Sequence, residues 1–234
     1  MSTATDVRER PILFSAPMVR AILDGQKTQT RRVVNLRNGM IDFVGSGLSR
    51  DPADPSSDWN NPSCWGYEHF DQGWCLLKPD GPSSHQIPCP YGQPGDRLWV
   101  RETWADLRGT GIGTASAAYR AESLNADGRE NADARRCRED YGVKWRPSIH
   151  MPRWASRITL EITDIRVERV REISRDDVIA EGICERDGLP IEDCHAGWHE
   201  PFAQLWDSIN AKRGFPWADN PWVWVVAFKR IDND

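Results

Sequence analysis

The first third of the chain shows apolar residues in two different spacings. Residues 11–15 (PILFS) form a short apolar run, which predicts a buried strand. Val19, Ile22 and Leu23 then follow at the spacing of one helix face, with Pro17 in a first-turn position and Ser15 in an N-cap position. Gly25 is a typical residue to end a helix, so we expect this helix to stop there.

Three later segments have the patterns of strands. Residues 97–104 (RLWVRETW) and 156–170 alternate between apolar and polar positions, as half-buried strands do. Residues 222–231 (WVWVVAFKRI) are almost continuously apolar. That run predicts a closing strand that is buried on both faces.

Two further helices are expected between these strands. Ser174 is a good N-cap residue, and Asp177 three positions later predicts a capping box. This helix should end at Gly182, directly after Glu181. Residues 200–212 carry an apolar stripe at helical spacing and predict the last helix.

Two stretches lack such patterns, at about residues 35–95 and 105–147, and we interpret them as long insertions. The strands outnumber the helices and do not alternate regularly with them, which disfavours a doubly wound parallel sheet. The pattern predicts an α+β fold: one domain over residues 1–234, built as a mixed β-barrel with flanking helices. Oligomeric state is left open.

Composition narrows the range of functions. The 234 residues include twelve Trp, and the formal net charge is -5. Such a charge argues against a broad basic surface for long duplex nucleic acid. The first ten residues are polar and no apolar run approaches the roughly 20 residues of a membrane span, so we expect a cytoplasmic protein without membrane contacts. The six Cys match no standard zinc spacing, and neither a metal nor a cofactor is predicted.

The polar segment at residues 25–32 (GQKTQTRR) is the richest in chemistry. It places Lys27, Thr30 and Arg32 directly after a helix stop, where side chains can converge on one pocket. Strict strand alternation would put Lys27 and Thr30 on opposite faces, whereas a turn at residues 27–28 would bring them together. Basic residues at this place also complement the helix dipole, and that is a sufficient structural explanation for them.

The same segment resembles the G-x-K-x-x-x-x-R signature of the ASCH domain, with Gly25, Lys27 and Arg32 in its three fixed positions. The strand after Gly95 and Asp96 and the order of the later elements also resemble this family. The likeness covers roughly half of the chain and is greatest to ASCH proteins of phages and prophages. It implies a PUA-like fold, in a superfamily whose members bind RNA or modified bases.

Some bacterial ASCH proteins are amidohydrolases that remove the acetyl group of N4-acetylcytidine. The resemblance implies Lys27, Thr30 and Glu181 as the catalytic residues of such an enzyme. The chemistry is consistent with the residue types, because amide hydrolysis needs a nucleophile, a base and stabilisation of an oxyanion. Glu181 can orient Lys27, protonate the leaving amine or activate water, and Arg32 can hold a carbonyl or phosphate oxygen.

Four further residues are candidates for substrate binding. Trp99 and Trp154 can stack on a base, although core packing is the more common role of Trp. His150 can hydrogen-bond a ligand, and a structural role in a loop explains it at least as well. Glu102 shares a strand face with apolar residues, so we expect it to be buried and paired with Lys27 or Arg32.

The candidate residues and the family resemblance together indicate three alternative functions. The first is hydrolysis of an acylated nucleoside, and the second is a binding module for single-stranded RNA or a modified base without turnover. Ribonuclease activity is the third, since some ASCH proteins cut RNA. The base and its modification are not determined by the sequence.

Overall fold

A computed structural model represents the protein. It describes residues 7–34, 89–110, 116–125, 128–186 and 188–231, together with the backbone of the strands β3 (Gly66–His69), β4 (Gly73–Lys78) and β5 (Gly81–Gln86). Most of the first expected insertion therefore lies outside the described residues. The three strands pair as an antiparallel sheet of their own.

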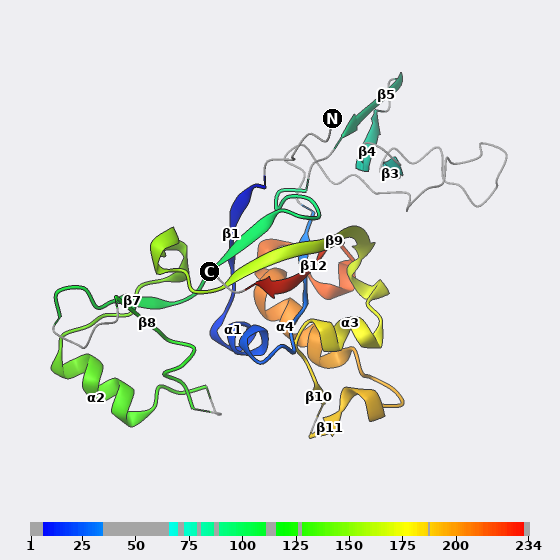
Figure 1. Ribbon diagram of the computed structural model, residues 1–234. Helices are drawn as coiled ribbons and strands as arrows, with labels where there is room; N and C mark the ends of the chain where they lie inside the picture. The colour runs from blue at the N-terminus through cyan, green and yellow to red at the C-terminus, as the bar shows by residue number, and fades with distance from the viewer. Residues whose placement is uncertain are drawn as a thin grey trace.

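The centre of the molecule is a mixed five-stranded sheet (Figure 1). Its strands lie in the order β1-β6-β9-β12-β2, with β1 parallel to β6 and all other neighbours antiparallel. Their bounds are Glu9–Leu13 for β1, Gln29–Val33 for β2, Arg97–Arg101 for β6, Thr159–Arg169 for β9 and Trp222–Ile231 for β12. The predicted α+β class is confirmed.

The two edge strands of this sheet, β1 and β2, are linked by a side-chain hydrogen bond. The Arg32 side chain on β2 donates a hydrogen bond of 2.6 Å to the backbone carbonyl of Leu13 on β1. Within the described residues no strand ladder joins β1 to β2, so the expected barrel is corrected to a curled, open sheet. β1 ends at Leu13, and only two residues separate it from the helix that follows. The Arg32 side chain spans the gap between β1 and β2.

Four α-helices accompany the sheet in the described part of the chain: α1 (Ala16–Leu23), α2 (Ala132–Asp140), α3 (Arg175–Ala180) and α4 (Glu200–Asn210). The capping box of Ser174 and Asp177 at the start of α3 is confirmed. Ser15 occupies the N-cap position of α1, but its side chain makes no cap hydrogen bond. None of these helices has the length and apolar character needed to cross a membrane.

Strand β12 separates two hydrophobic cores, because its residues alternate between the two faces of the sheet. Trp224, Val226 and Phe228 pack on the side of β1 and α1. Val223 and Val225 pack on the other side with Phe202 and Trp206 of α4 and with residues of α3. The prediction that this strand is buried on both faces is confirmed.

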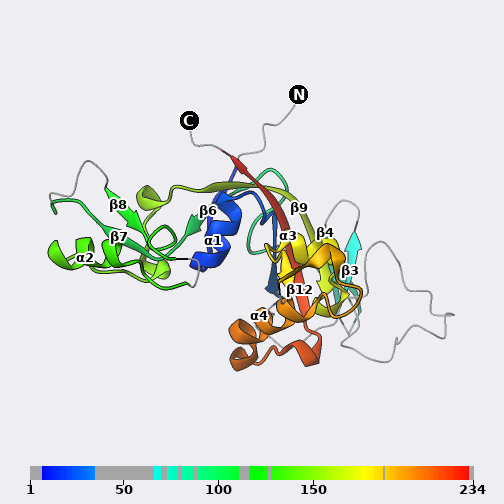
Figure 2. The ribbon, with the colours of Figure 1, turned by 90° about the horizontal axis from the view of Figure 1, so that it is seen from below.

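The second insertion forms a separate lobe. The predicted strand 97–104 divides into β6 and β7 (Trp104–Asp106), and β7 pairs with β8 (Ala117–Tyr119). These two strands and α2 lie on the opposite side of the molecule from α3 and α4 in both ribbon views (Figures 1 and 2). A small hairpin of β10 (Glu185–Arg186) and β11 (Leu189–Pro190) follows α3.

Candidate functional site

The polar segment after α1 is held against the end of α3. Gly25 has a left-handed backbone (φ 75°), which ends α1 as expected and turns the chain toward α3. Lys27 and Glu181 then form an isolated antiparallel β-bridge, and the Thr28 amide donates to the carbonyl of Ala180 at 2.9 Å. The backbone alone therefore brings two residues together that are 154 positions apart in the sequence.

Glycine at position 182 permits this close approach. Gly182 has a φ of 86°, and a Cβ atom there would lie 2.9 Å from the Cβ of Ala21 and 3.1 Å from the Cβ of Lys27. Contacts this short are incompatible with ordinary packing, and the left-handed conformation also favours glycine. The glycine expected as a helix stop therefore has a second role in placing Glu181 beside Lys27.

The Lys27 and Glu181 side chains form a buried ion pair. The Lys27 Nζ donates to Glu181 Oε2 at 2.7 Å and to the Glu181 backbone carbonyl at 2.8 Å. The exposed fraction of the two side chains is 0% and 4%. Burial lowers the pKa of Lys27, while the adjacent carboxylate of Glu181 acts in the opposite direction.

A cavity of about 220 Å³ opens beside this pair, between β2, the end of β1 and α4. Thr30 and Glu181 both line it, as does Arg32. Lys27 contacts Glu181 from behind the cavity wall. Two cations flank the Phe14 ring next to the site, with Lys27 Nζ 5.8 Å and the Arg32 guanidinium 5.2 Å from the ring centre. The structure thus brings four residues of the expected site together.

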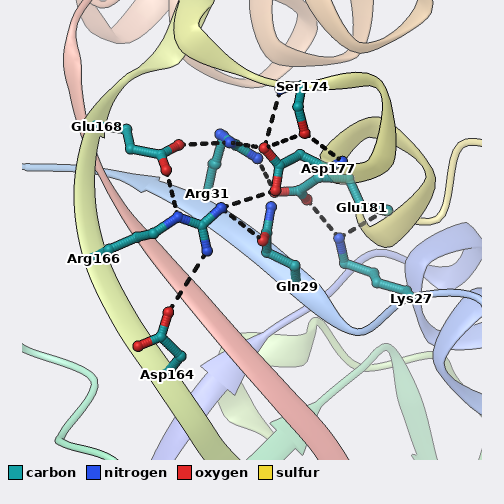
Figure 3. Close-up of polar contacts among 9 residues, drawn as sticks. All are labelled: Lys27, Gln29, Arg31, Asp164, Arg166, Glu168, Ser174, Asp177 and Glu181. Carbon is teal, nitrogen blue, oxygen red and sulfur yellow. Dashed lines mark hydrogen bonds and ion pairs between the residues drawn. The ribbon is translucent and has the colours of Figure 1, made fainter.

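A network of charged side chains lies on the other face of β2 (Figure 3). Arg31, with no exposed side-chain surface, donates to Glu168 at 2.8 Å and to Asp177 at 3.1 Å, and its Nη1 lies 3.8 Å from Glu181 Oε1. Arg166 joins the same two carboxylates and also donates to Gln29 at 3.2 Å. Every carboxylate around Arg31 is therefore shared with a second cation or a cap.

Unpaired polar atoms are concentrated at this site. Six buried side-chain nitrogen or oxygen atoms in the described part of the chain have no hydrogen-bond partner. Five of them belong to β2 and its neighbour: Gln29 Nε2, Arg31 Nε, Arg31 Nη1, Arg32 Nε and Glu181 Oε1. Buried polar groups in native proteins are nearly always paired, so such a concentration is typical of a ligand site.

The other predicted binding residues lie elsewhere. Glu102 is buried as expected, but its partner is Arg157 at 2.9 Å rather than Lys27 or Arg32. Glu102 directly follows β6 and Arg157 shortly precedes β9, and these two strands pair with each other. Burial raises the pKa of Glu102, and the hydrogen bond from Arg157 opposes that shift. Trp99 is largely buried, with the Arg101 guanidinium over its ring.

Trp154 and His150 belong to the lobe of the second insertion. Trp154 packs edge-on against Trp104 and carries the Arg108 guanidinium on one face, and 46% of its surface is exposed. His150 ends a short 3-10 helix and is exposed. Neither residue lines the cavity beside Glu181. Among the described residues, no three metal-ligating side chains gather at one place.

Several cavity residues were not identified from the sequence. Tyr91 lies at the end of the first insertion, and Trp206 and Arg213 come from the last helix and the turn after it. The buried network around Arg31 was also missed. The sequence does contain an indication of this network. Asp164, Arg166 and Glu168 occupy every second position of a predicted strand, so their charges lie on one face.

No known family model and no curated protein matches the sequence. Two solved structures are similar to it at a distance. An ASCH domain from Lactobacillus crispatus JV V101 is 13% identical, with a TM-score of 0.35, over 92% of this chain and 71% of that one. A DUF984 protein from Enterococcus faecalis V583 is 8% identical, with a TM-score of 0.38, over 97% of this chain and 83% of that one. The α+β class stands on the sheet and helices described above.

Proposed function

We propose that the protein hydrolyses the amide bond of an acylated modified nucleoside such as N4-acetylcytidine, as an ASCH-type amidohydrolase. One observation carries this proposal: the buried pair of Lys27 and Glu181 leaves an unpaired carboxylate oxygen beside a cavity that Thr30 also lines. An alcohol and an acid thus line one cavity, and the amine lies directly behind the acid.

In the proposed reaction Glu181 handles the proton. Lys27 holds Oε2, so we assign the proton transfer to Oε1, a buried oxygen that has no hydrogen-bond partner and lies 3.8 Å from Arg31 Nη1. Glu181 takes a proton from the attacking water as the oxygen bonds to the acyl carbon, and the same proton passes to the nitrogen as the C–N bond breaks. The products are a carboxylic acid and the free amino nucleoside.

Thr30 offers a second route to the same products. Its hydroxyl attacks the acyl carbon and gives its proton to Lys27, and the C–N bond breaks as that proton passes to the nitrogen of the leaving nucleoside. Water then hydrolyses the resulting ester to the carboxylic acid and regenerates the hydroxyl. Lys27 is the base for this step, which its lowered pKa assists, because the buried amine loses its proton more readily than an exposed one.

The size of the cavity supports a small substrate. Its volume of about 220 Å³ is below the roughly 300–1,000 Å³ of typical drug-sized pockets. A single base with part of its ribose suits such a volume better than several stacked nucleotides do. The apolar wall from α4, including Trp206, suits the flat face of a base.

The test is incubation of the purified protein with N4-acetylcytidine and other N4-acylated cytidines, followed by separation of the products. We expect cytidine and the free acid to appear, and we expect Glu181→Gln to abolish their formation. Glu161→Gln is the matched control, because Glu161 is a strand carboxylate paired with Lys229 and lies outside the cavity lining. Absence of turnover across the panel would contradict the proposal.

A second candidate is a base-binding module without turnover. The position of Lys27 behind the cavity wall favours it, because the amine then serves to hold Glu181 rather than to meet a substrate. Titration with modified and unmodified nucleosides separates the two candidates. Tight binding of an acylated nucleoside that is recovered unchanged would support the module and exclude the hydrolase.

A further inference from the structure

Two arginines of the cavity lack the carboxylate partners that Lys27 and Arg31 have. Arg32 and Arg213, the last residue of the 3-10 helix Ala211–Arg213, both line the cavity. Among the described residues neither forms a salt bridge: Arg32 donates to the Leu13 carbonyl at 2.6 Å, and Arg213 donates to the Asn210 side chain at 3.4 Å. Both contacts are to neutral groups and leave the positive charges uncompensated.

The cavity as a whole is therefore positive. Among the described residues that line it, Arg31 is neutralised by Glu168 and Asp177 from outside the lining. Arg32 and Arg213 remain, against the single carboxylate of Glu181. That carboxylate is already approached by Lys27 and Arg31. The chain as a whole carries a net charge of -5, so a positive cavity runs against the general charge of the protein.

The electrostatics of Arg32 agree with this description. Burial lowers the pKa of Arg32, and the like charge of Arg213 lowers it further, while Tyr91 and Glu181 oppose the shift. Burial in turn raises the pKa of Tyr91. The Tyr91 phenol consequently stays neutral and keeps a proton to donate. Two guanidinium groups and a hydroxyl donor within one cavity form a typical surrounding for an anion.

We propose that Arg32, Arg213 and Tyr91 form a phosphate subsite, so that the cavity takes a phosphorylated nucleoside rather than a neutral one. Only the identity of the base in this inference rests on the proposed function. The unpaired Arg32 Nε and the exposed Arg213 guanidinium supply the donors, and the planar guanidinium group matches the spacing of phosphate oxygens. The phosphate belongs either to a free mononucleotide or to a phosphodiester of single-stranded RNA.

The test is a binding measurement that needs no turnover. Isothermal titration compares cytidine, cytidine 5′-monophosphate, cytidine 3′-monophosphate, the dinucleotide CpC and inorganic phosphate on the intact protein. We expect the monophosphates to bind about tenfold more tightly than cytidine, as one charge-assisted contact provides. A CpC affinity above that of both monophosphates assigns the subsite to RNA, and the reverse assigns it to a free nucleotide.

Arg213→Gln should remove most of this preference and leave cytidine binding unchanged. The matched control is Lys212→Gln, which deletes the neighbouring exposed charge outside the cavity lining. Arg32→Gln is a second variant with the same expected direction. Equal affinity for cytidine and its monophosphates, or equal effects of the Arg213 and Lys212 variants, would overturn the inference.

The same titrations separate this inference from the proposed function. If inorganic phosphate binds in an Arg213-dependent manner while no cytidine compound binds or turns over, the phosphate subsite stands and the nucleoside hydrolase falls. If N4-acetylcytidine is hydrolysed as fast as its 5′-monophosphate, the hydrolase stands and the phosphate subsite falls.

Discussion

The two faces of strand β2 carry neighbouring arginines in different surroundings. Arg31 points to α3 and β9, where Glu168 and Asp177 accept its hydrogen bonds. Arg32 points to the other face, where its guanidinium lies over Phe14 and lines a cavity without a carboxylate partner of its own in the described structure. We call the Arg31 side the closed face because ion pairs neutralise its charge, although Arg31 also borders the cavity and its Nε and Nη1 have no hydrogen-bond partner. The Arg32 side is the open face, where positive charge is left for a ligand.

The difference shows how one strand can combine stability with binding. Burial of an arginine is costly unless carboxylates surround it, and the Arg31 face meets that condition. A ligand site needs the opposite, because groups that are already satisfied gain nothing from a ligand. Alternation along a strand allows both conditions at adjacent residues.

The largest effect is expected when the closed face loses its central cation. Arg31→Met leaves Glu168 and Asp177 short of a partner and should reduce the free energy of unfolding by about 3–5 kcal/mol. Denaturant unfolding followed by Trp fluorescence measures this. Arg166→Met is the matched control, with a smaller expected loss because 32% of that side chain is exposed. Equal losses for both variants would mean that Arg31 is not the centre of the network.

On the open face, removal of a hydroxyl should change activity more than stability. Thr30→Val keeps the shape of the side chain but should lower kcat/KM for the acylated nucleoside about 100-fold, or about 3 kcal/mol in the activation free energy. Thr30→Ser should retain most of the activity. If the valine variant turns over normally, the water route through Glu181 is the correct one.

Low pH should weaken the ion pairs of the closed face, in particular the one between Asp177 and Arg31. Burial raises the pKa of Asp177, but hydrogen bonds from Ser174 and Arg31 outweigh it and hold the pKa well below its usual value. The unfolded chain then binds this proton first, so the stabilisation is complete above about pH 4 and is lost as the pH falls further. At neutral pH, Asp177→Asn should be less stable by about 2 kcal/mol, since hydrogen bonds to a charged group are lost.

That deficit should shrink as the pH falls below about 4, because the Asp177 carboxyl of the unfolded wild-type chain is then protonated while that of the folded chain stays ionised to a lower pH. Thermal unfolding between pH 2 and 7 measures it. Asp176→Asn, one residue earlier in α3, is the control, because Asp176 makes no salt bridge with a described residue. A constant difference between wild type and Asp177→Asn over this range would contradict the pKa shift.

The smallest effect on stability is expected at the second arginine. Arg32→Met loses one hydrogen bond to a neutral carbonyl and no ion pair, so the free energy of unfolding should change by about 1 kcal/mol. Binding of an anionic ligand should weaken in the same variant. A loss as large as that of Arg31→Met would erase the distinction between the two faces.

The elements were largely predictable because each carries a local signal. Gly25, the capping box at Ser174 and the apolar run of β12 depend on neighbours in sequence, and each lies where expected. The convergence of residues 27 and 181 was expected from the family resemblance alone. Alternation left two arrangements of Lys27 and Thr30 open, since a β-bridge to a distant helix end cannot be deduced from local spacing.

Partners of buried charges were the least predictable feature. Glu102 was correctly expected to be buried, but its partner is Arg157, which lies just before β9 and beyond the second insertion. Arg31 similarly depends on β9 and α3, whose positions relative to β2 follow from the curl of the sheet. Such pairings are set by tertiary structure, so residue types alone do not identify them.

The ties between positions 27 and 181 have a consequence for how the protein can change. Main-chain contacts hold these two positions independently of the Lys27 amine. Replacement of that amine therefore alters reactivity while the scaffold keeps its register. Substitutions at position 27, natural or engineered, can therefore change the reactive group while the main-chain contacts around it are retained.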